Sequence, residues 1–214
     1  MSEAVLDHLQ FTDAHQQREA ARIGMWIFLA TEVMFFAALF TAYSIFLHLN
    51  PEGFISASRH NDFWLGSLNT AVLLTSSLTM ALAVQAAKAG EQKALIRFLL
   101  VTMVLGSAFL GIKGIEYAHH FHEHLFPGPD FSYDPRYARP AQMFFYLYFT
   151  MTAIHGLHMI GGIGVLAVLV ELSRRGKITM SYNTPIELAG LYWHFVDVIW
   201  IFLFPMLYLL GGHP

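Results

Sequence analysis

The chain of 214 residues contains no cysteine. Without thiolates it cannot form disulfides, cysteine-ligated zinc sites, iron–sulfur clusters or covalently attached c-type haem. A dinuclear copper centre bridged by thiolates is excluded for the same reason. The absence of cysteine does not indicate a compartment, because a membrane protein needs no disulfides in lipid.

Charged residues are also scarce. They make up 13% of the chain, against about 25% in soluble domains. Hydrophobic residues make up 56%, and the mean hydropathy is +0.49. A chain of this composition cannot cover an apolar interior with a polar surface, so we expect a membrane protein. The net charge of −3 gives no indication of nucleic acid as a partner.

Five stretches reach the length of about 20 mostly apolar residues that a membrane-spanning helix needs. We place them at about residues 23–47, 63–87, 98–118, 141–170 and 188–210. Residues 1–22 are polar and are predicted to form a cytoplasmic tail. The apolar run that follows is about 25 residues long, longer than the core of a signal peptide, so we expect a retained helix. The sequence therefore predicts an all-α integral membrane protein, a five-helix bundle made by one domain over residues 1–214.

The positions of Lys and Arg predict the orientation, since these residues stay on the cytoplasmic side of a membrane. With five spans, the amino-terminal tail and the loops at 88–97 and 171–187 share one face, which carries eight Lys and Arg residues. The other face carries three, with Lys113 near it. We therefore expect the amino terminus in the cytoplasm and the carboxyl terminus outside. The proline-rich segment at about 119–140 is expected to be an irregular external loop.

Glu32 lies about nine residues into the first predicted helix, near the bilayer midplane at about 1.5 Å per residue. Ionisable groups at that depth usually face the interior of the bundle. A charged carboxylate is unfavourable there, so two interpretations stay open. Glu32 is either a neutral acid hydrogen-bonded to a neighbouring helix or a group that takes part in proton movement.

Three further pairs of polar residues have i, i+3 spacing inside predicted helices, so that the members of each pair share a face. They are Lys113 with Glu116, His155 with His158, and His194 with Asp197. We expect the first pair to form an ion pair near the outer interface. The other two pairs are expected to build one interhelical polar network, with a metal or haem site as the alternative.

The number of histidines argues against haem in this chain. A haem iron held on both faces needs two histidines from opposite sides, normally on different helices. Only three histidines lie within the predicted spans, and two of them are neighbours on one helix. Four more, at positions 119, 120, 122 and 124, follow the third span together with Glu123. This run is either an ordinary helix end or a zinc or copper site.

Arg174 and Arg175 lie at the predicted cytoplasmic end of the fourth span. Arginine binds phosphate with paired, charge-assisted hydrogen bonds. We therefore expect these two residues to hold the phosphate of a membrane lipid.

Taken together, the buried motifs resemble subunit III of haem–copper terminal oxidases. The family's helix that bears a buried glutamate is similar to Arg22-Ile-Gly-Met-Trp-Ile-Phe-Leu-Ala-Thr-Glu32-Val-Met-Phe-Phe36. Its following elements resemble Leu68-Asn-Thr-Ala-Val-Leu-Leu74, Glu116-Tyr117 and His155-Gly-Leu-His158. Its last helix gives the most specific match, to Glu187-Leu-Ala-Gly-Leu-Tyr-Trp-His-Phe-Val-Asp-Val-Ile-Trp200. The similarity runs in this order from Arg22 to Leu210.

The resemblance implies a subunit without redox centres in a proton-pumping, O₂-reducing oxidase. Such a subunit packs on the catalytic subunit I, supports its proton uptake and stability, and binds phospholipid. Glu32 carries over as the buried, carbodiimide-reactive acid. The intramembrane polar residues that carry over are Glu116, His155, His158, His194 and Asp197. Haem and copper are expected in partner subunits, which include subunits I and II, and not in this chain.

The resemblance also bears on the host and the electron donor. The mitochondrial form has seven spans, whereas five-span forms occur in bacterial quinol oxidases. We therefore expect a multi-pass protein of a bacterial inner membrane with a periplasmic carboxyl terminus, and the lipid-filled cleft of the seven-span form is in doubt. Glu32 favours a cytochrome c oxidase, because the quinol branch has Asp at the matching place. A quinol oxidase is the alternative, and an independent proton-coupled transporter is a more distant one.

Overall fold

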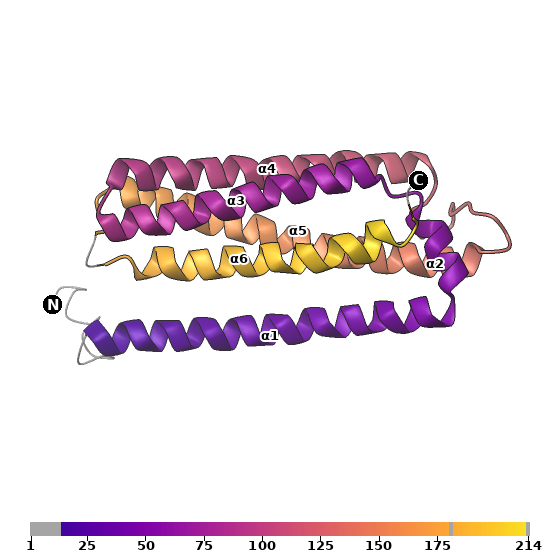
Figure 1. Ribbon diagram of the computed structural model, residues 1–214, viewed down its shortest axis with the longest axis horizontal. Helices are drawn as coiled ribbons and strands as arrows, with labels where there is room; N and C mark the ends of the chain where they lie inside the picture. Colours follow the sequence, from indigo (N-terminus) through magenta and orange to yellow (C-terminus); the bar gives the residue numbers. More distant parts are fainter. Residues whose placement is uncertain (1–13, 180–181, 213–214) are drawn as a thin grey trace.

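The computed structural model describes residues 14–179 and 182–212. Five helices that are long and apolar enough to span a membrane run along the long axis of the molecule (Figure 1). The prediction of an all-α protein with five spanning helices is confirmed. The elements are α1 (Ala14–Leu49), α2 (Pro51–Ser58), α3 (Phe63–Ala89), α4 (Gln92–His122), α5 (Ala138–Arg174), α6 (Thr184–Phe204) and the π-helical turn η2 (Pro205–Leu209).

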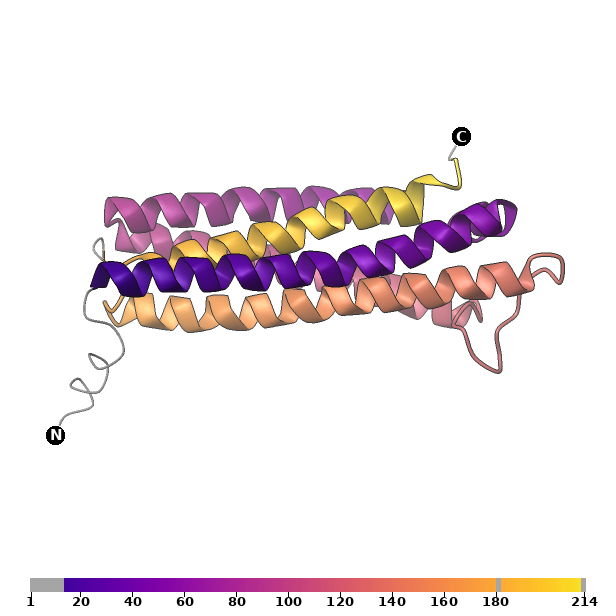
Figure 2. The same cartoon turned by 90° about the horizontal axis from the view of Figure 1, so that it is seen from below.

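Helices α3 to α6 form a closed ring of neighbours, in which α3 packs on α4, α4 on α5, α5 on α6, and α6 on α3. Helix α1 lies outside this ring and contacts α5 and α6 (Figure 2). In the most apolar 18-residue stretch of α1, only 11% of the residues are buried inside the molecule. In the corresponding stretch of the span that contains α6, 44% are buried. Most of the surface of α1 is therefore apolar and open to lipid or to another protein chain.

The helices extend beyond the apolar stretches that predict them. Helix α1 begins at Ala14, so residues 14–22, expected as part of a polar tail, are helical, and residues 1–13 lie outside the described residues. Helix α4 continues to His122, and the irregular loop before α5 is therefore 123–137. Hydropathy detects the part of a helix that faces lipid, whereas these helices continue past it. The sidedness predicted from the charges stays a prediction.

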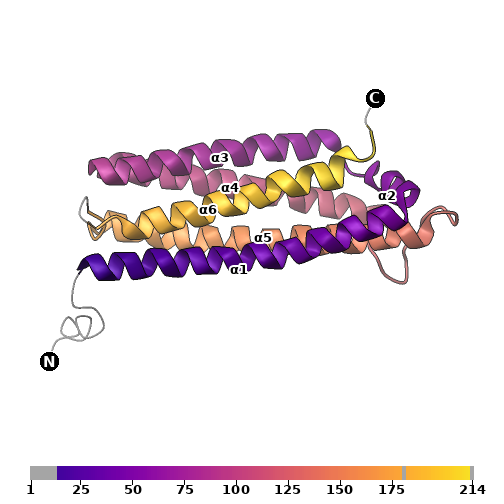
Figure 3. The same ribbon diagram turned by 60° about the horizontal axis from the view of Figure 1, so that its bottom comes forward.

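The end of α6 is tied to the short helix α2, which the sequence does not predict (Figure 3). Pro205 interrupts the regular hydrogen bonding of α6, because proline has no backbone N–H to donate. Side chains bond the carbonyl groups that η2 leaves free. The carbonyl of Leu207 accepts from Ser58 Oγ and Asn61 Nδ2, each at 2.9 Å, and Tyr43 donates to the carbonyl before it. Ser58 of α2 and Asn61 just after it therefore satisfy a carbonyl group that lipid could not.

Candidate functional site: polar groups within the bundle

Glu32, halfway along α1, contacts His158 of α5, with Oε2 of the carboxyl group 3.0 Å from Nε2 of the ring. The hydrogen bond to a neighbouring helix, one of the two interpretations of Glu32, is therefore present. About a fifth of each side chain is exposed, 20% for Glu32 and 19% for His158. The pair thus lies at the edge of the contact between α1 and α5. The hydroxyl of Tyr192 fixes the α5 backbone beside it by donating to the carbonyl of His158 at 2.9 Å.

The second hydrogen bond of His158 decides how many protons this pair holds. Nδ1 lies 2.9 Å from the carbonyl oxygen of Ile154. A carbonyl only accepts, so Nδ1 carries a proton. The contact between Nε2 and Glu32 then needs one more proton, which resides either on the ring or on the carboxyl group. Glu32 and His158 therefore share a single proton, and the pair is neutral as a unit in both arrangements.

Lys113 and Glu116 form the predicted ion pair, with Nζ 3.1 Å from Oε2. They are buried inside the bundle, with 9% and 2% of their side chains exposed. Nζ also donates to the hydroxyls of Tyr148 at 2.9 Å and Tyr208 at 2.7 Å. Both hydroxyls donate in turn to Oε1 of Glu116. This closed cluster joins α4, α5 and the turn η2, and its two tyrosines are not predicted from the sequence.

His155 is enclosed by aromatic rings. Its ring centroid lies 5.5 Å from that of Phe109 and 5.3 Å from that of Trp200. Neither ring nitrogen has a hydrogen-bond partner among the described residues. Both nitrogens of His158, by contrast, are hydrogen-bonded, to the carbonyl of Ile154 and to Glu32. The two histidines of α5 therefore lie in different surroundings, one among aromatic rings and one hydrogen-bonded.

His194 and Asp197 of α6 both face Ser77 of α3. Nδ1 of His194 lies 2.7 Å from Ser77 Oγ, and the same hydroxyl lies within reach of Asp197. Asp197 is 3% exposed. Neither of its carboxylate oxygens makes a hydrogen bond of standard geometry within the described part of the chain. The i, i+3 spacing thus brings two ionisable groups to one neighbour, as the sequence predicts.

The prediction that these pairs build a single network is wrong. The hydrogen bonds among the described residues leave three separate groups, around Glu32, around Lys113 and around Ser77. His155 and His158 belong to different surroundings, although they are three residues apart. Three residues correspond to a rotation of about 60° around the helix axis. Because α5 is in contact with α1, α4 and α6, this rotation changes which helix a side chain meets.

The histidines at the end of α4 also lie in different surroundings, although they are close in the sequence. His119 is exposed and lies 3.1 Å from Glu123. His120 is 1% exposed and packs between aromatic rings such as those of Phe145 and Tyr148. No group of three histidine or acidic residues that could hold a metal ion occurs among the described residues. The structure therefore gives no support to the zinc or copper interpretation.

The end of the bundle that carries most Lys and Arg residues holds a further ionic cluster, which the sequence analysis does not identify. Glu187 of α6 bonds Arg22 of α1 at 2.8 Å and Lys88 of α3 at 3.2 Å. Arg174 and Arg175, at the end of α5, are exposed, and Nε of Arg175 lies 2.7 Å from Oε1 of Glu171. The cluster around Glu187 links three helices at one membrane edge.

Comparison with known proteins gives the family of the chain. The family model described as cytochrome c oxidase subunit III matches residues 4–212. The chain belongs to the cytochrome c oxidase subunit III family. As a subunit III it is part of a terminal oxidase complex, in which its role is that of an accessory subunit.

Relatives within the subunit III family carry names for two electron donors. A cytochrome c oxidase subunit 3 of Alkalihalophilus pseudofirmus is 34% identical over 189 residues, which cover 88% of this chain and 86% of the relative. A quinol oxidase subunit 3 of Bacillus spizizenii is 31% identical over 199 residues, with 91% of each chain covered. A cytochrome bo(3) ubiquinol oxidase subunit 3 of Pseudomonas aeruginosa is 33% identical over 202 residues, which cover 93% of this chain and 89% of the relative. Because the identities are so similar, they do not decide between cytochrome c and quinol.

Proposed function

We propose that this subunit III packs on the catalytic subunit I of a proton-pumping, O₂-reducing oxidase in a bacterial inner membrane, and supports its proton uptake and stability. The main support is the match of the subunit III family model over residues 4–212, and the contacts of the intramembrane histidines agree with it. His158 and His194 are hydrogen-bonded within the chain, and His155 is enclosed by aromatic rings. As part of the proposal, haem and copper lie in partner subunits, including subunits I and II. The open apolar surface of α1 leaves room for such a partner.

Purification through an affinity tag on this chain tests the proposal. From the native membrane, we expect the chain to bring down a haem-bearing subunit with a visible absorption spectrum. The same chain expressed alone is expected to be colourless. Isolation of the chain as a stable species that never associates with a haem protein would contradict the proposal, as would stoichiometric iron in the chain expressed alone.

For the electron donor we propose cytochrome c, on the basis of Glu32. The composition of the purified complex distinguishes this donor from quinol. A co-purifying subunit II with a soluble dinuclear copper domain, together with oxidation of reduced cytochrome c, is the expected result. A complex that oxidises only quinol would assign the chain to the alternative branch and leave its accessory role unchanged.

Replacing Glu32 by glutamine is expected to leave the subunit in the complex in near wild-type amounts. The amide keeps a donor that can bond Nε2 of His158 when the ring is neutral with its proton on Nδ1. The measurement is the ratio of subunit III to haem after purification. Glu32→Leu is the matched control, since it leaves Nε2 without a partner inside the membrane and should lower that ratio. Complete loss of the subunit from Glu32→Gln would show that the pair needs an ionisable acid.

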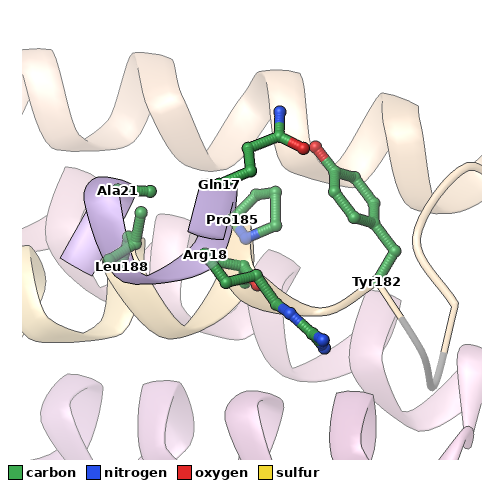
Figure 4. A pocket seen from close by; sticks show the side chains of 7 residues that line it. Gln17, Arg18, Ala21, Tyr182, Pro185 and Leu188 are labelled. Atoms are coloured by element: carbon green, nitrogen blue, oxygen red, sulfur yellow. The ribbon is translucent and has the colours of Figure 1, made fainter. Parts of the chain in front are cut away.

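A bound phospholipid is a further part of the proposal. A cavity of about 560 Å³ opens at the Arg-rich end of the bundle, between the first turns of α1 and the start of α6. Arg18, Gln17 and Tyr182 bring polar groups to this cavity, and Pro185 and Leu188 give it an apolar lining (Figure 4). A cation and a phenol beside apolar lining residues suit a lipid headgroup and the start of its acyl chains. Arg174 and Arg175 at the end of α5 lie at the same end of the bundle and are proposed to add contacts to phosphate.

Removing these arginines is expected to lower the amount of phospholipid that purifies with the complex. The variants are Arg18→Ala and the double change Arg174→Ala with Arg175→Ala, and the measurement is phosphorus per complex with identification of the lipids by mass spectrometry. Arg136→Ala is the control, because Arg136 is an exposed arginine in the loop at the opposite end. If all variants retain the lipid of the wild type, the assignment of these arginines is wrong.

A further inference from the structure

A groove runs between α3 and α6 from the ionic cluster at one membrane edge toward the interior. Its volume is about 380 Å³. Lys88 and Glu187 lie at its mouth, where Nζ and the carboxylate are 3.2 Å apart. Gln85 lines the next turn and His194 lies at the inner end. The groove therefore connects a charged, water-facing edge with an imidazole that is seven residues, or about 10 Å, further along α6.

Beyond His194 the polar contacts continue to a buried acid. Nδ1 of His194 lies 2.7 Å from Oγ of Ser77, and the same hydroxyl lies within reach of Asp197. Asp197 is buried with both carboxylate oxygens lacking a hydrogen bond of standard geometry. An acid at this depth is costly as an unpaired anion, and a neighbouring hydroxyl that can donate to it is the group that offsets this cost. The three side chains thus lie in a line that ends at Asp197, with a hydrogen bond between His194 and Ser77 and a contact outside standard hydrogen-bond geometry between Ser77 and Asp197.

The chemistry of the three groups suits proton transfer along this line. Imidazole can hold a proton on either nitrogen, and a serine hydroxyl can accept and donate at the same time. A protonated His194 can give its Nδ1 proton to Ser77 Oγ while the hydroxyl gives its own proton to the carboxylate of Asp197. The charges of imidazolium and carboxylate are both neutralised, no other group changes, and His194 is left with its proton on Nε2. The reverse sequence returns the proton to water at the groove.

We infer that Asp197 is a proton-binding site that exchanges its proton with water at the Lys88 end of the bundle through His194 and Ser77. This site is separate from the pair formed by Glu32 and His158, with which it shares no hydrogen bond among the described residues. The charged groups facing the route are Lys88 from α3 and Glu187 from α6, and Arg22 of α1 bonds Glu187. These three groups carry two positive charges and one negative charge, so they add no net negative charge at this end of the groove.

Infrared spectroscopy of the purified complex that contains this chain tests the inference. The protonated carboxyl group of Asp197 should give a C=O band that shifts to lower frequency in D₂O and is absent in Asp197→Asn. Labelling with ¹³C-aspartate separates this band from that of glutamate side chains such as Glu32. We expect the shift to be complete soon after transfer of the wild-type complex into D₂O.

Two variants examine the route without removing the acid. Ser77→Ala breaks the line between His194 and Asp197, and Ala81→Leu fills the groove that Ala81 lines. We expect both to slow the exchange by about 10²-fold, the lower end of what a positioned proton-transfer group contributes. Thr75→Ala is the matched control, since it removes a hydroxyl from the same helix that, among the described residues, bonds only the backbone carbonyl of Ala71.

Each outcome decides the question. Slow exchange in Ser77→Ala and Ala81→Leu with wild-type exchange in Thr75→Ala supports the route. Absence of an aspartate C=O band, slow exchange in the wild type, or equal rates in all variants overturns it. None of these results alters the assignment of the chain as subunit III, which depends on the partners that purify with it.

Discussion

Replacing Lys113 by methionine is expected to lower the free energy of unfolding by about 3–5 kcal/mol, the range measured when one partner of a buried ion pair is removed. Nζ of Lys113 contacts Glu116 and two tyrosine hydroxyls in a site that is almost fully enclosed. Methionine fills a similar volume but leaves the carboxylate of Glu116 without a counter-charge. Denaturant titration of helical content in detergent, with wild type and variant measured side by side, gives the difference.

A double variant separates the charge from the packing. In Lys113→Met combined with Glu116→Leu, no unpaired charge remains, and replacement of a whole buried ion pair by apolar residues is often close to neutral. We therefore expect the double variant to be more stable than Lys113→Met alone, although one residue more is changed. Equal loss in the single and double variants would mean that the hydroxyls of Tyr148 and Tyr208, and not the ion pair, determine the stability of the cluster.

The five spanning helices could be predicted from the sequence because lipid imposes one simple rule. Every backbone polar group in the hydrocarbon region must be satisfied within a helix, so an apolar run of sufficient length has one solution. Helix α2 and the turn η2 follow no such rule. Their positions depend on Pro205 and on side chains such as Ser58 and Asn61 that reach a carbonyl about 150 residues away. Hydropathy contains no information about these contacts.

The candidate site shows the same limit. Lys113 and Glu116 could be paired from the sequence, because three residues on one helix fix their separation whatever the rest of the fold does. The contact between Glu32 and His158 joins residues 126 positions apart and exists only once α1 packs on α5. The sequence wrongly suggests that His155 and His158 belong to one polar network. In the ring of helices, the rotation between these two positions on α5 is enough to bring their side chains against different helices. Ser77 could not be distinguished from the other hydroxyl residues of α3 until α6 was placed beside it.

Replacing Trp193 by alanine is expected to give the second large loss of stability. Trp193 is 1% exposed, and its Nε1 donates to Ser76 Oγ of α3 at 3.1 Å. A side-chain carbon added at Gly106 of α4 or Gly162 of α5 would lie 2.9 or 3.0 Å from the indole ring. The indole ring of Trp193 therefore fills a space that α4 and α5 leave open because they have glycine at positions 106 and 162. In soluble proteins, truncation of such a residue costs about 3–5 kcal/mol. We expect the loss in free energy of unfolding to lie at or below this range. The unfolded chain stays in lipid, so the contribution from transferring the side chain out of water is smaller.

Gly106→Leu shows whether the indole and the glycine act as one unit. Alone, Gly106→Leu should also destabilise the bundle, since its first side-chain carbon would meet the ring of Trp193 at less than the van der Waals distance. Combined with Trp193→Ala, the leucine can occupy the space that the indole vacates. The double variant should therefore lose clearly less free energy of unfolding than the two single variants lose in sum. The coupling expected for residues in direct contact is about 0.5–3 kcal/mol. Additive losses in denaturant titration would show that α4 moves away from α6 when the ring is removed, and that the packing of Trp193 does not fix the distance between these helices.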